Sequence, residues 1–377
     1  MRAVDSRLPF SSILRPNATG TGKPYVVLPS RHRSGWLLPA EPVLRGAGLR
    51  SFGHRGVKGF LGGALLTTRL LRGERHWLDV APLERQLALA LGEPDVHLAF
   101  CIGTSGAYRK LTVQVMTHRD EVPAYAKIAA HPLAQASLER EHQNLLRLST
   151  VDGLRDRVPR VLGWFRWNGT QVLVVTAGSG RVGPRRLTER HAEFLRRLHE
   201  AFAEERAFEA SAMWARMVAT VRRLAPRMSP EWSLRCQRAL AQLRAGLGPV
   251  VLPLSLAHRD FAPWNTRVGP RGLFVFDWET AADGVIPLYD VFHFQAIQAA
   301  QAGRPFHPFR GRHHEIVAAL WPKWKAYLAH LYLAYLMDMG LFYTEARLLA
   351  PELEEEREWH WFGRQIDAYA GSRHAVA

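Results

Sequence analysis

One stretch, HRDFAPWN at residues 258–265, constrains the fold of this 377-residue chain more than any other. It follows the apolar run VVLPLSLA and precedes a short strand TRV, a turn GPRG and a second apolar strand LFVFD. This pattern predicts a strand, then a polar loop, then a β-hairpin. The hairpin would return Asp277, at the end of its second strand, to the loop that carries Asp260 and Asn265.

These three polar side chains together predict phosphoryl transfer. Asp260 would accept or orient the proton of a hydroxyl nucleophile, while Asn265 and Asp277 offer hard oxygen ligands to Mg²⁺ beside nucleotide phosphates. An aspartate that ends an apolar strand needs a metal or a hydrogen-bond partner. Taken alone, Asp277 has the alternative of capping a turn, and its spacing from the other two residues favours the functional interpretation.

Lysine is scarce in this chain, with six lysines against forty-four arginines. Lys127 nevertheless stands inside the predicted strand AYAKIAA, where the alternative is an exposed charge at a sheet edge. In the helix predicted over 133–148, Glu141 lies on the same stripe as Leu145 and Leu148. A buried carboxylate needs a partner, so we expect a Lys127–Glu141 pair that presents the ammonium to the α- and β-phosphates. The alternative for Glu141 is an exposed position at the rim.

The segment IGTSGAYRK offers a second phosphate contact. Gly103 and Gly106 lie between two predicted strands, where backbone N–H groups can approach phosphates closely. Glycines are also ordinary in hairpin turns. Lys110, just beyond, is either a phosphate contact or a surface charge, and the sequence leaves both open.

The chain changes character twice along its length. Residues 1–94 alternate short apolar runs with Gly, Pro and Arg and end in a helical pattern. Residues 95–176 are rich in strand patterns with one helix, and residues 177–377 are mainly helical. We therefore expect an α+β protein with a β-rich N-lobe, a mainly α-helical C-lobe and an N-terminal extension whose role the sequence does not show.

The formal net charge is +16, and residues 1–90 hold fourteen Lys or Arg against five Asp or Glu. Such a segment is a candidate for binding an anionic surface or ligand, with a solvated basic face as the alternative. Neither an aromatic RNA-binding motif nor zinc-finger spacing accompanies the charge, so nucleic acid is not predicted.

Three observations predict a cytoplasmic protein without a transmembrane segment. Cys101 and Cys236 are far apart and form no disulfide framework, which fits a reducing compartment. The start of the sequence lacks the apolar core of a secretory signal. The apolar segment 326–343 carries His330 and Asp338, which indicates a buried helix because charge at mid-membrane depth is unfavourable.

With the HxDxxxxN loop and Asp277 in place, residues 95–300 resemble the aminoglycoside phosphotransferase and choline kinase-like family of the protein kinase-like superfamily. The resemblance implies a bilobal protein kinase-like fold that uses ATP and Mg²⁺. It implies that Asp260 is the catalytic base, that Asn265 and Asp277 hold the metal, and that Lys127 contacts the α/β-phosphates while paired with Glu141. The acceptor would be a hydroxyl of a small molecule: a sugar, a glycan precursor, an amino alcohol or an aminoglycoside-like compound.

The same resemblance assigns further residues. VVTAG at 174–178 matches the inter-lobe hinge, so Val175 and Ala177 would meet the adenine. Asp290 matches an aspartate that supports the catalytic loop, together with His258. One departure is Arg259, which stands where small-molecule members usually have glycine, as in protein kinases. No APE-like segment follows Asp277, however, so a protein kinase is not indicated.

The sequence leaves open whether the protein is an active enzyme and which acceptor it uses. The alternative to an active enzyme is a kinase-like module that binds a nucleotide or a partner without turnover, but every polar residue of the pattern is retained. The net charge of +16 disfavours polycationic acceptors at long range and favours neutral or anionic ones. A local acidic pocket that used the run at 352–357 would reverse this preference.

Overall fold

The computed structural model describes residues 14, 22–29, 35–41, 75–102, 108–117, 121–308, 315, 322–349 and 356–371. The chain forms two compact units. The first consists of residues 1–146 and 159–178, and the second of residues 147–158 and 179–377. The division passes through one helix, since the last residues of the helix that ends at Ser149 belong to the second unit.

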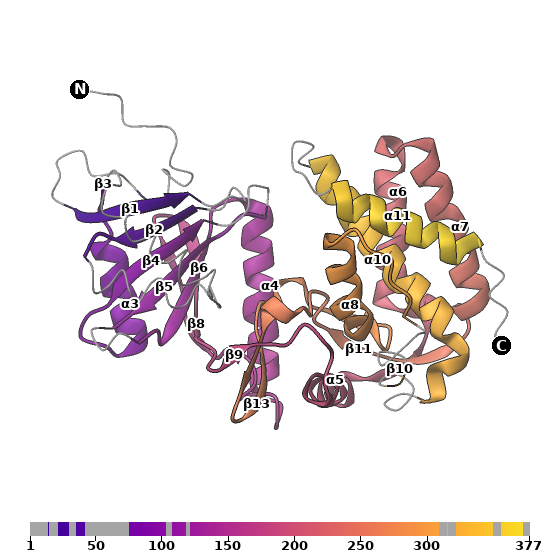
Figure 1. Ribbon diagram of the computed structural model, residues 1–377, viewed down its shortest axis with the longest axis horizontal. Coiled ribbons are helices and arrows are strands. Elements are labelled where there is room, and N and C mark those ends of the chain that lie inside the picture. The colour runs from indigo at the N-terminus through magenta and orange to yellow at the C-terminus, as the bar shows by residue number, and fades with distance from the viewer. Residues whose placement is uncertain are drawn as a thin grey trace. The chain divides into compact units, whose positions relative to one another are not determined.

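The first unit is built on an eight-stranded sheet in the order β3-β1-β2-β4-β5-β6-β8-β7 (Figure 1). All neighbouring strands in it are antiparallel. Its elements are β1 (Lys23–Pro29), β2 (Gly35–Pro39), β3 (Arg75–Leu78), α3 (Ala81–Leu91), β4 (His97–Ile102), β5 (Leu111–Met116), β6 (Ala124–Ala129), α4 (Pro132–Ser149), β7 (Val161–Trp167) and β8 (Thr170–Thr176).

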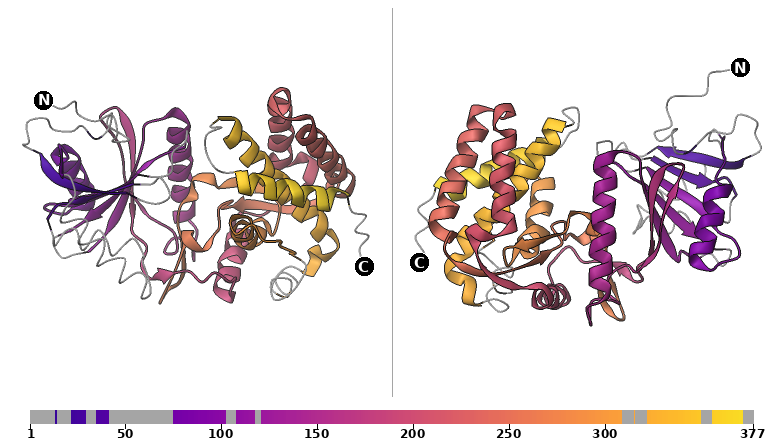
Figure 2. Two further views of the ribbon diagram at one scale, coloured as in Figure 1. Left: turned by 45° about the horizontal axis from the view of Figure 1, so that its top comes forward. Right: turned by 180° about the vertical axis from the view of Figure 1, so that it is seen from behind.

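Helices cover both faces of this sheet, as the views in Figure 2 show. Leu83 and Leu87 of α3 share a hydrophobic core with Ala126 and Ile128 of β6. Successive side chains of a strand point to opposite faces, so Lys127 points to the other face. There its ammonium meets α4, which therefore packs opposite α3.

The N-terminal segment contributes three strands to the same sheet. β2 pairs with β4 across the boundary expected at 94/95, with Trp36 opposite Cys101. Tyr25 and Leu37 are buried in the core that also contains Phe100. The helical pattern at the end of this segment forms α3, which begins with proline in its first turn and ends at Gly92 in the left-handed conformation.

The second unit is mainly helical, as predicted. It contains two three-stranded sheets, ordered β10-β11-β14 and β13-β12-β9. Its strands are β9 (Arg181–Val182), β10 (Glu204–Ala207), β11 (Val251–Ala257), β12 (Thr266–Gly269), β13 (Gly272–Val275) and β14 (Ala282–Val285). Its helices are α5 (Glu189–Phe202), α6 (Ala212–Leu224), α7 (Pro230–Leu247), α8 (Tyr289–Gln301), α10 (Leu328–Leu349) and α11 (Glu356–Gly371). Short 3₁₀ turns include η3 (Pro263–Asn265) and η4 (Trp278–Thr280).

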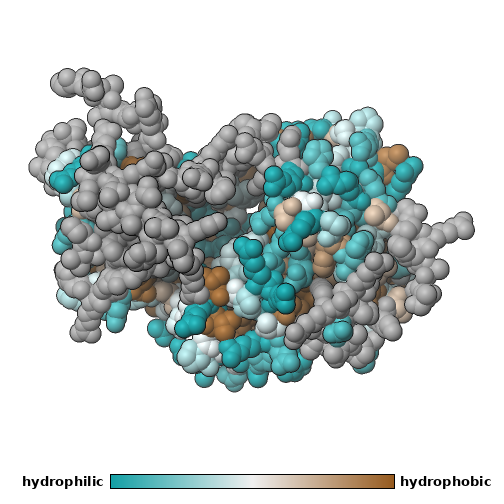
Figure 3. All heavy atoms as spheres, viewed as in Figure 1, coloured by the Kyte–Doolittle hydropathy of each residue, from teal (hydrophilic) through white to brown (hydrophobic). Residues whose placement is uncertain are grey.

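The core of the second unit surrounds α10. This helix contacts α6, α7, α8 and α11 (Figure 1), and residues 331–337 expose no side-chain surface. The apolar segment expected as a buried helix at 326–343 is thus buried in protein. Within the described part of the chain, no helix is long and apolar enough to span a membrane. On the face drawn in Figure 3, the helices of this unit present mostly hydrophilic side chains with single apolar ones between them.

Candidate active site

His258 joins the end of β11 to the strand that leads to Asp277. Its imidazole is fully buried. The backbone N–H of Asp260 donates to His258 Nδ1 over 3.2 Å. Nε2 lies 3.0 Å from the carbonyl oxygen of Phe276, to which it donates. Because Nδ1 accepts a bond, the proton of the neutral ring belongs on Nε2. One buried side chain therefore connects the loop backbone at Asp260 with the residue before Asp277.

Asp290 holds the same loop from the first turn of α8. Its two carboxylate oxygens accept the backbone N–H groups of His258, over 2.8 Å, and of Arg259, over 2.9 Å. Burial raises the pKa of Asp290, and the neighbouring His258 and the two N–H groups limit the rise. A carboxylate that spans two successive amides leaves the loop backbone little freedom.

Asn265 and Asp260 are joined directly. The Nδ2 group of Asn265 donates to the backbone oxygen of Asp260 over 2.9 Å and to Asp260 Oδ2 over 2.8 Å. Asn265 is buried, whereas the Asp260 side chain is 34% exposed. Because Asp260 takes the nitrogen of the amide, the Oδ1 atom of Asn265 is directed away from Asp260. A carbonyl oxygen in that position is a suitable ligand for a hard cation.

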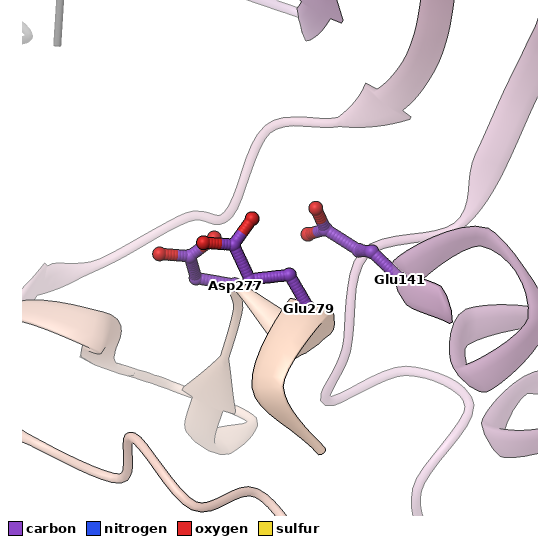
Figure 4. A group of neighbouring side chains, drawn as sticks. All are labelled: Glu141, Asp277 and Glu279. Carbon is purple, nitrogen blue, oxygen red and sulfur yellow. The ribbon is translucent and has the colours of Figure 1, made fainter. Parts of the chain in front are cut away.

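Asp277 ends the β12–β13 hairpin in a left-handed conformation, with φ of 74°. Aspartate is among the few residues that tolerate this region. Oxygens of its carboxylate and of the Glu279 carboxylate lie within 4.8 Å of each other. Figure 4 shows the Asp277 and Glu279 side chains at the start of η4. Two adjacent carboxylates supply the hard, anionic oxygens that Mg²⁺ prefers.

Arg259 also has a positive φ, of 64°. Such a conformation explains why glycine is usual at this position in the family that the sequence resembles. Here the Arg259 side chain reaches α10, where its Nη2 lies 2.7 Å from Asp338 Oδ2. The hydroxyl of Tyr289 donates to the same oxygen over 2.6 Å. Asp338, the aspartate expected in this buried helix, therefore has a cationic partner in the HRD loop, residues 258–265.

In the first unit, Lys127 and Glu141 form the expected ion pair. The ammonium lies 2.6 Å from both carboxylate oxygens of Glu141, and the side chains are 13% and 1% exposed. β6 is paired on both sides, with Lys127 between Thr112 of β5 and Leu173 of β8. Lys127 is therefore not a charge at a sheet edge, and Glu141 does not lie at an exposed rim. A buried pair of this kind indicates a fixed ammonium group.

Val175 and Ala177, which are also expected at the nucleotide site, lie at the end of β8 and directly after it. Val175 is buried in β8 between β6 and β7. Ala177 follows the strand, and its N–H donates to the carbonyl of Pro123 over 2.8 Å. Gly103 and Gly106 lie outside the described residues.

Two residues near Asp260 and Asp277 were not expected from the sequence. Glu279 follows Asp277 by two positions, and its acidic character within DWE was the available signal. His293 is one helical turn after Asp290 in α8, and its Nε2 lies 3.3 Å from Asp260 Oδ1. A histidine inside the apolar pattern VFHF gives no sign of its partner, because the partner comes from another part of the chain.

The second unit thus combines a partly exposed carboxylate with a set of hard oxygen donors. Asp260 can accept the proton of a hydroxyl group, and Asn265, Asp277 and Glu279 can hold a divalent cation. The first unit adds an ammonium group fixed by a buried carboxylate. A general base, ligands for a divalent cation and a fixed ammonium group are what phosphoryl transfer from a nucleotide requires.

Comparisons with known proteins agree with this chemistry. The model of the phosphotransferase enzyme family matches residues 103–327. No curated protein matches the chain significantly.

Solved structures that resemble the chain are small-molecule kinases. A choline/ethanolamine kinase family protein from Mesorhizobium loti has a TM-score of 0.51 at 14% identity, over 74% of this chain and 88% of that one. A thermostable mutant of aminoglycoside phosphotransferase APH(4)-Ia has a TM-score of 0.52 at 15% identity, over 78% and 99%. A Plasmodium vivax ethanolamine kinase has a TM-score of 0.50 at 13% identity, over 72% and 82%.

These structures share the protein kinase-like fold with this chain, and the resemblance inferred from the sequence is confirmed. Since the family model covers more than half of the sequence, the chain belongs to the phosphotransferase enzyme family.

Proposed function

We propose that this enzyme transfers the γ-phosphate of ATP, with Mg²⁺, to a hydroxyl group of a small molecule. The observation that carries the proposal is the environment of Asp260. Its carboxylate is anchored by Asn265 and is one-third exposed, so a hydroxyl acceptor can reach it. Asp260 accepts the proton as the hydroxyl oxygen attacks the phosphorus in line with the leaving group.

The phosphates would be bound by a metal ion, which side chains of this protein hold, and by one lysine. Asn265 Oδ1 and the Asp277 carboxylate would hold Mg²⁺, which when bound offsets the charge of the β- and γ-phosphates. Glu279, beside Asp277, adds a third oxygen donor. Lys127, held by Glu141, would bind the α- and β-phosphates. Because Glu141 holds the Lys127 ammonium, this charge keeps its orientation and can stabilise the transition state without reorganising.

The adenine would lie against the strand end at Val175 and Ala177. The Ala177 N–H donates to Pro123, so we assign adenine recognition at this residue to its carbonyl oxygen. That oxygen would accept the exocyclic amino group of the adenine.

Charge favours a neutral or anionic acceptor over a polycation. The chain carries a net charge of +16, and residues 352–355, which begin the acidic run, lie outside the described residues. Sugars, glycan precursors and small alcohols are therefore the first compounds to test. Cys101 and Cys236 are free thiols, which fits the reducing and ATP-containing cytoplasm as the compartment. The basic segment 1–94 stays a predicted binder of anionic surfaces, and weakening of such binding by salt would test it.

The test is calorimetric titration of the purified protein with ATP, with and without Mg²⁺, for wild type, Asp277→Ala and Asp283→Ala. Asp283 is a matched control because it belongs to the same unit and pairs with Arg147 at an exposed position. We expect Mg²⁺-dependent binding that weakens in Asp277→Ala only. Binding that ignores both Mg²⁺ and Asp277 would refute the metal assignment.

Turnover is then measured with a panel of hydroxyl acceptors for wild type and Asp260→Ala. We expect the variant to bind ATP as wild type does and to lose turnover by at least about a hundredfold. Nucleotide binding without turnover on any acceptor in the wild type would support the alternative, a regulatory module.

A further inference from the structure

His293 is the one side chain outside the HRDFAPWN loop that contacts the Asp260 carboxylate among the bonds described above. It lies in α8, four residues after the start of the helix, and is 1% exposed. Its Nε2 is 3.3 Å from Asp260 Oδ1. Its Nδ1 is 3.4 Å from the hydroxyl of Tyr335 in α10, which is fully buried. A buried imidazole thus connects the helical core to the proposed catalytic base.

The partners define the direction of both hydrogen bonds. An ionised carboxylate only accepts, so the bond to Asp260 requires a proton on Nε2 of His293. In the neutral ring Nδ1 is then an acceptor, and the Tyr335 hydroxyl can donate to it. The resulting order is Tyr335 O–H to His293 Nδ1, and His293 Nε2–H to Asp260 Oδ1. Each buried polar group in this chain of bonds has a partner, as buried groups require.

The two oxygens of Asp260 are held from different sides. Asn265 donates to Oδ2 and His293 donates to Oδ1. The terminal torsion of an aspartate is broad, so a single hydrogen bond leaves the carboxylate plane loosely defined. Two donors on two oxygens fix that plane. The anchor at Oδ1 comes from the core helix α8 rather than from the loop itself.

We propose that His293 is a positioning residue, which fixes the carboxylate plane of Asp260 so that one lone pair faces the hydroxyl of the acceptor. This inference rests on the proposed function, in which Asp260 accepts that proton. A histidine that merely filled the core would not need a proton on Nε2, and an apolar side chain of similar volume would replace it. A positioning residue affects the chemical step and leaves nucleotide binding unchanged.

The kinetic test compares two replacements. His293→Gln keeps an N–H donor at about the reach of Nε2, and His293→Met fills similar space without a donor. We expect His293→Met to lower kcat by about tenfold to a hundredfold, with the KM for ATP within about twofold of wild type. We expect His293→Gln to recover kcat to within about threefold of wild type. Equal melting temperatures would exclude loss of folding as the cause.

A spectroscopic test does not depend on turnover. Nitrogen-15 spectra of labelled histidine side chains report the ring tautomer, and the His293 signals are those missing in His293→Gln. We expect the Nε2–H tautomer in wild type and a shifted Nε2 resonance in Asp260→Ala. In Tyr335→Phe we expect the Nδ1 resonance to move instead.

Several results would overturn the proposal. These are a proton on Nδ1, wild-type kcat in His293→Met, or the same loss of kcat in His293→Met and His293→Gln. If Asp260→Ala retained full turnover, the proposed function would fail and the positioning role with it. The nitrogen-15 spectra would still decide whether His293 donates to Asp260, so the two failures are distinguishable.

Discussion

Arg259 and Asp338 stand 79 residues apart and form an ion pair in the interior of the second unit, with 2.7 Å between Nη2 and Oδ2. The Arg259 Nε donates to the same oxygen over 3.1 Å, and its Nη1 donates to the carbonyl of Thr280 over 3.2 Å. Positive φ at a non-glycine residue is strained by about 1–3 kcal/mol. The ion pair offsets this strain and ties the HRD loop to α10.

This pair predicts a large effect of Asp338→Asn on stability. Burial by itself would raise the pKa of Asp338, but Arg259, Arg216 and the Tyr289 hydroxyl outweigh burial and lower it to about 2. The variant leaves the buried Arg259 without its counter-charge, so we expect the free energy of unfolding to fall by about 3–5 kcal/mol in denaturant titration.

Arg216→Met is the matched control for that variant. Arg216 contacts the other oxygen of Asp338 at 3.4 Å and is one-third exposed. We expect its loss to lower the free energy of unfolding by less than about 1 kcal/mol. Similar losses in the two variants would mean that Arg259 is not the main partner of Asp338.

Lys127→Met and Glu141→Gln should each lower kcat/KM for ATP. Lys127 loses its fixed position when Glu141 is neutral, so we expect losses of about a hundredfold or more from Lys127→Met and smaller ones from Glu141→Gln. The double variant should resemble Lys127→Met, because the carboxylate acts through the ammonium. Steady-state kinetics at varied ATP would measure all three.

Lys23→Met serves as the control for this pair. Lys23 forms an ion pair with Glu84 in the same unit and is half-exposed. Its removal should leave kcat/KM for ATP unchanged. A comparable loss in this variant would point to damage of the sheet rather than of a phosphate contact.

The helix α3 offers a test of how far the N-terminal segment stabilises the first unit. Leu87 is fully buried and Leu89 is 84% exposed, two positions apart on the same helix. We expect Leu87→Ala to lower the free energy of unfolding by about 2–5 kcal/mol. Leu89→Ala should change it by less than about 0.5 kcal/mol. Equal and small changes would show that the segment packs loosely on the sheet.

His191 predicts a pH dependence of stability. Burial lowers the pKa of His191 to about 4, from an ordinary value of 6.5. The folded state thus resists a proton that the unfolded state binds below pH 6.5. Stability is therefore complete above pH 6.5 and is lost as the pH falls toward 4, by up to about 3 kcal/mol from this residue.

His191→Gln should remove this contribution. The Thr188 N–H donates to His191 Nδ1 over 3.2 Å in a capping box, and glutamine is a usual residue at that position. We expect the wild type to lose stability faster than the variant between pH 6.5 and pH 4 in denaturant titrations. Parallel pH profiles would contradict a buried, neutral His191.

Local sequence carried much of the candidate site. Asp260 and Asn265 are five residues apart in one loop, and the turn GPRG closes a hairpin that returns Asp277 to that loop. Lys127 and Glu141 are fourteen residues apart, on a strand and the helix that follows it. Over such short separations the strand and helix periodicities determine which side chains can meet, so the residue pattern alone predicts the contacts.

Only the tertiary structure decided the partners that come from distant parts of the chain. The contacts of Arg259 with Asp338 and of Asp260 with His293 depend on how α8 and α10 pack against the loop after β11. The pairing of β2 with β4, which extends the sheet into the N-terminal segment, depends on which strand meets a free sheet edge. Sequence periodicity does not predict how helices pack or which strand edges pair. Shape complementarity and burial across the whole fold determine both.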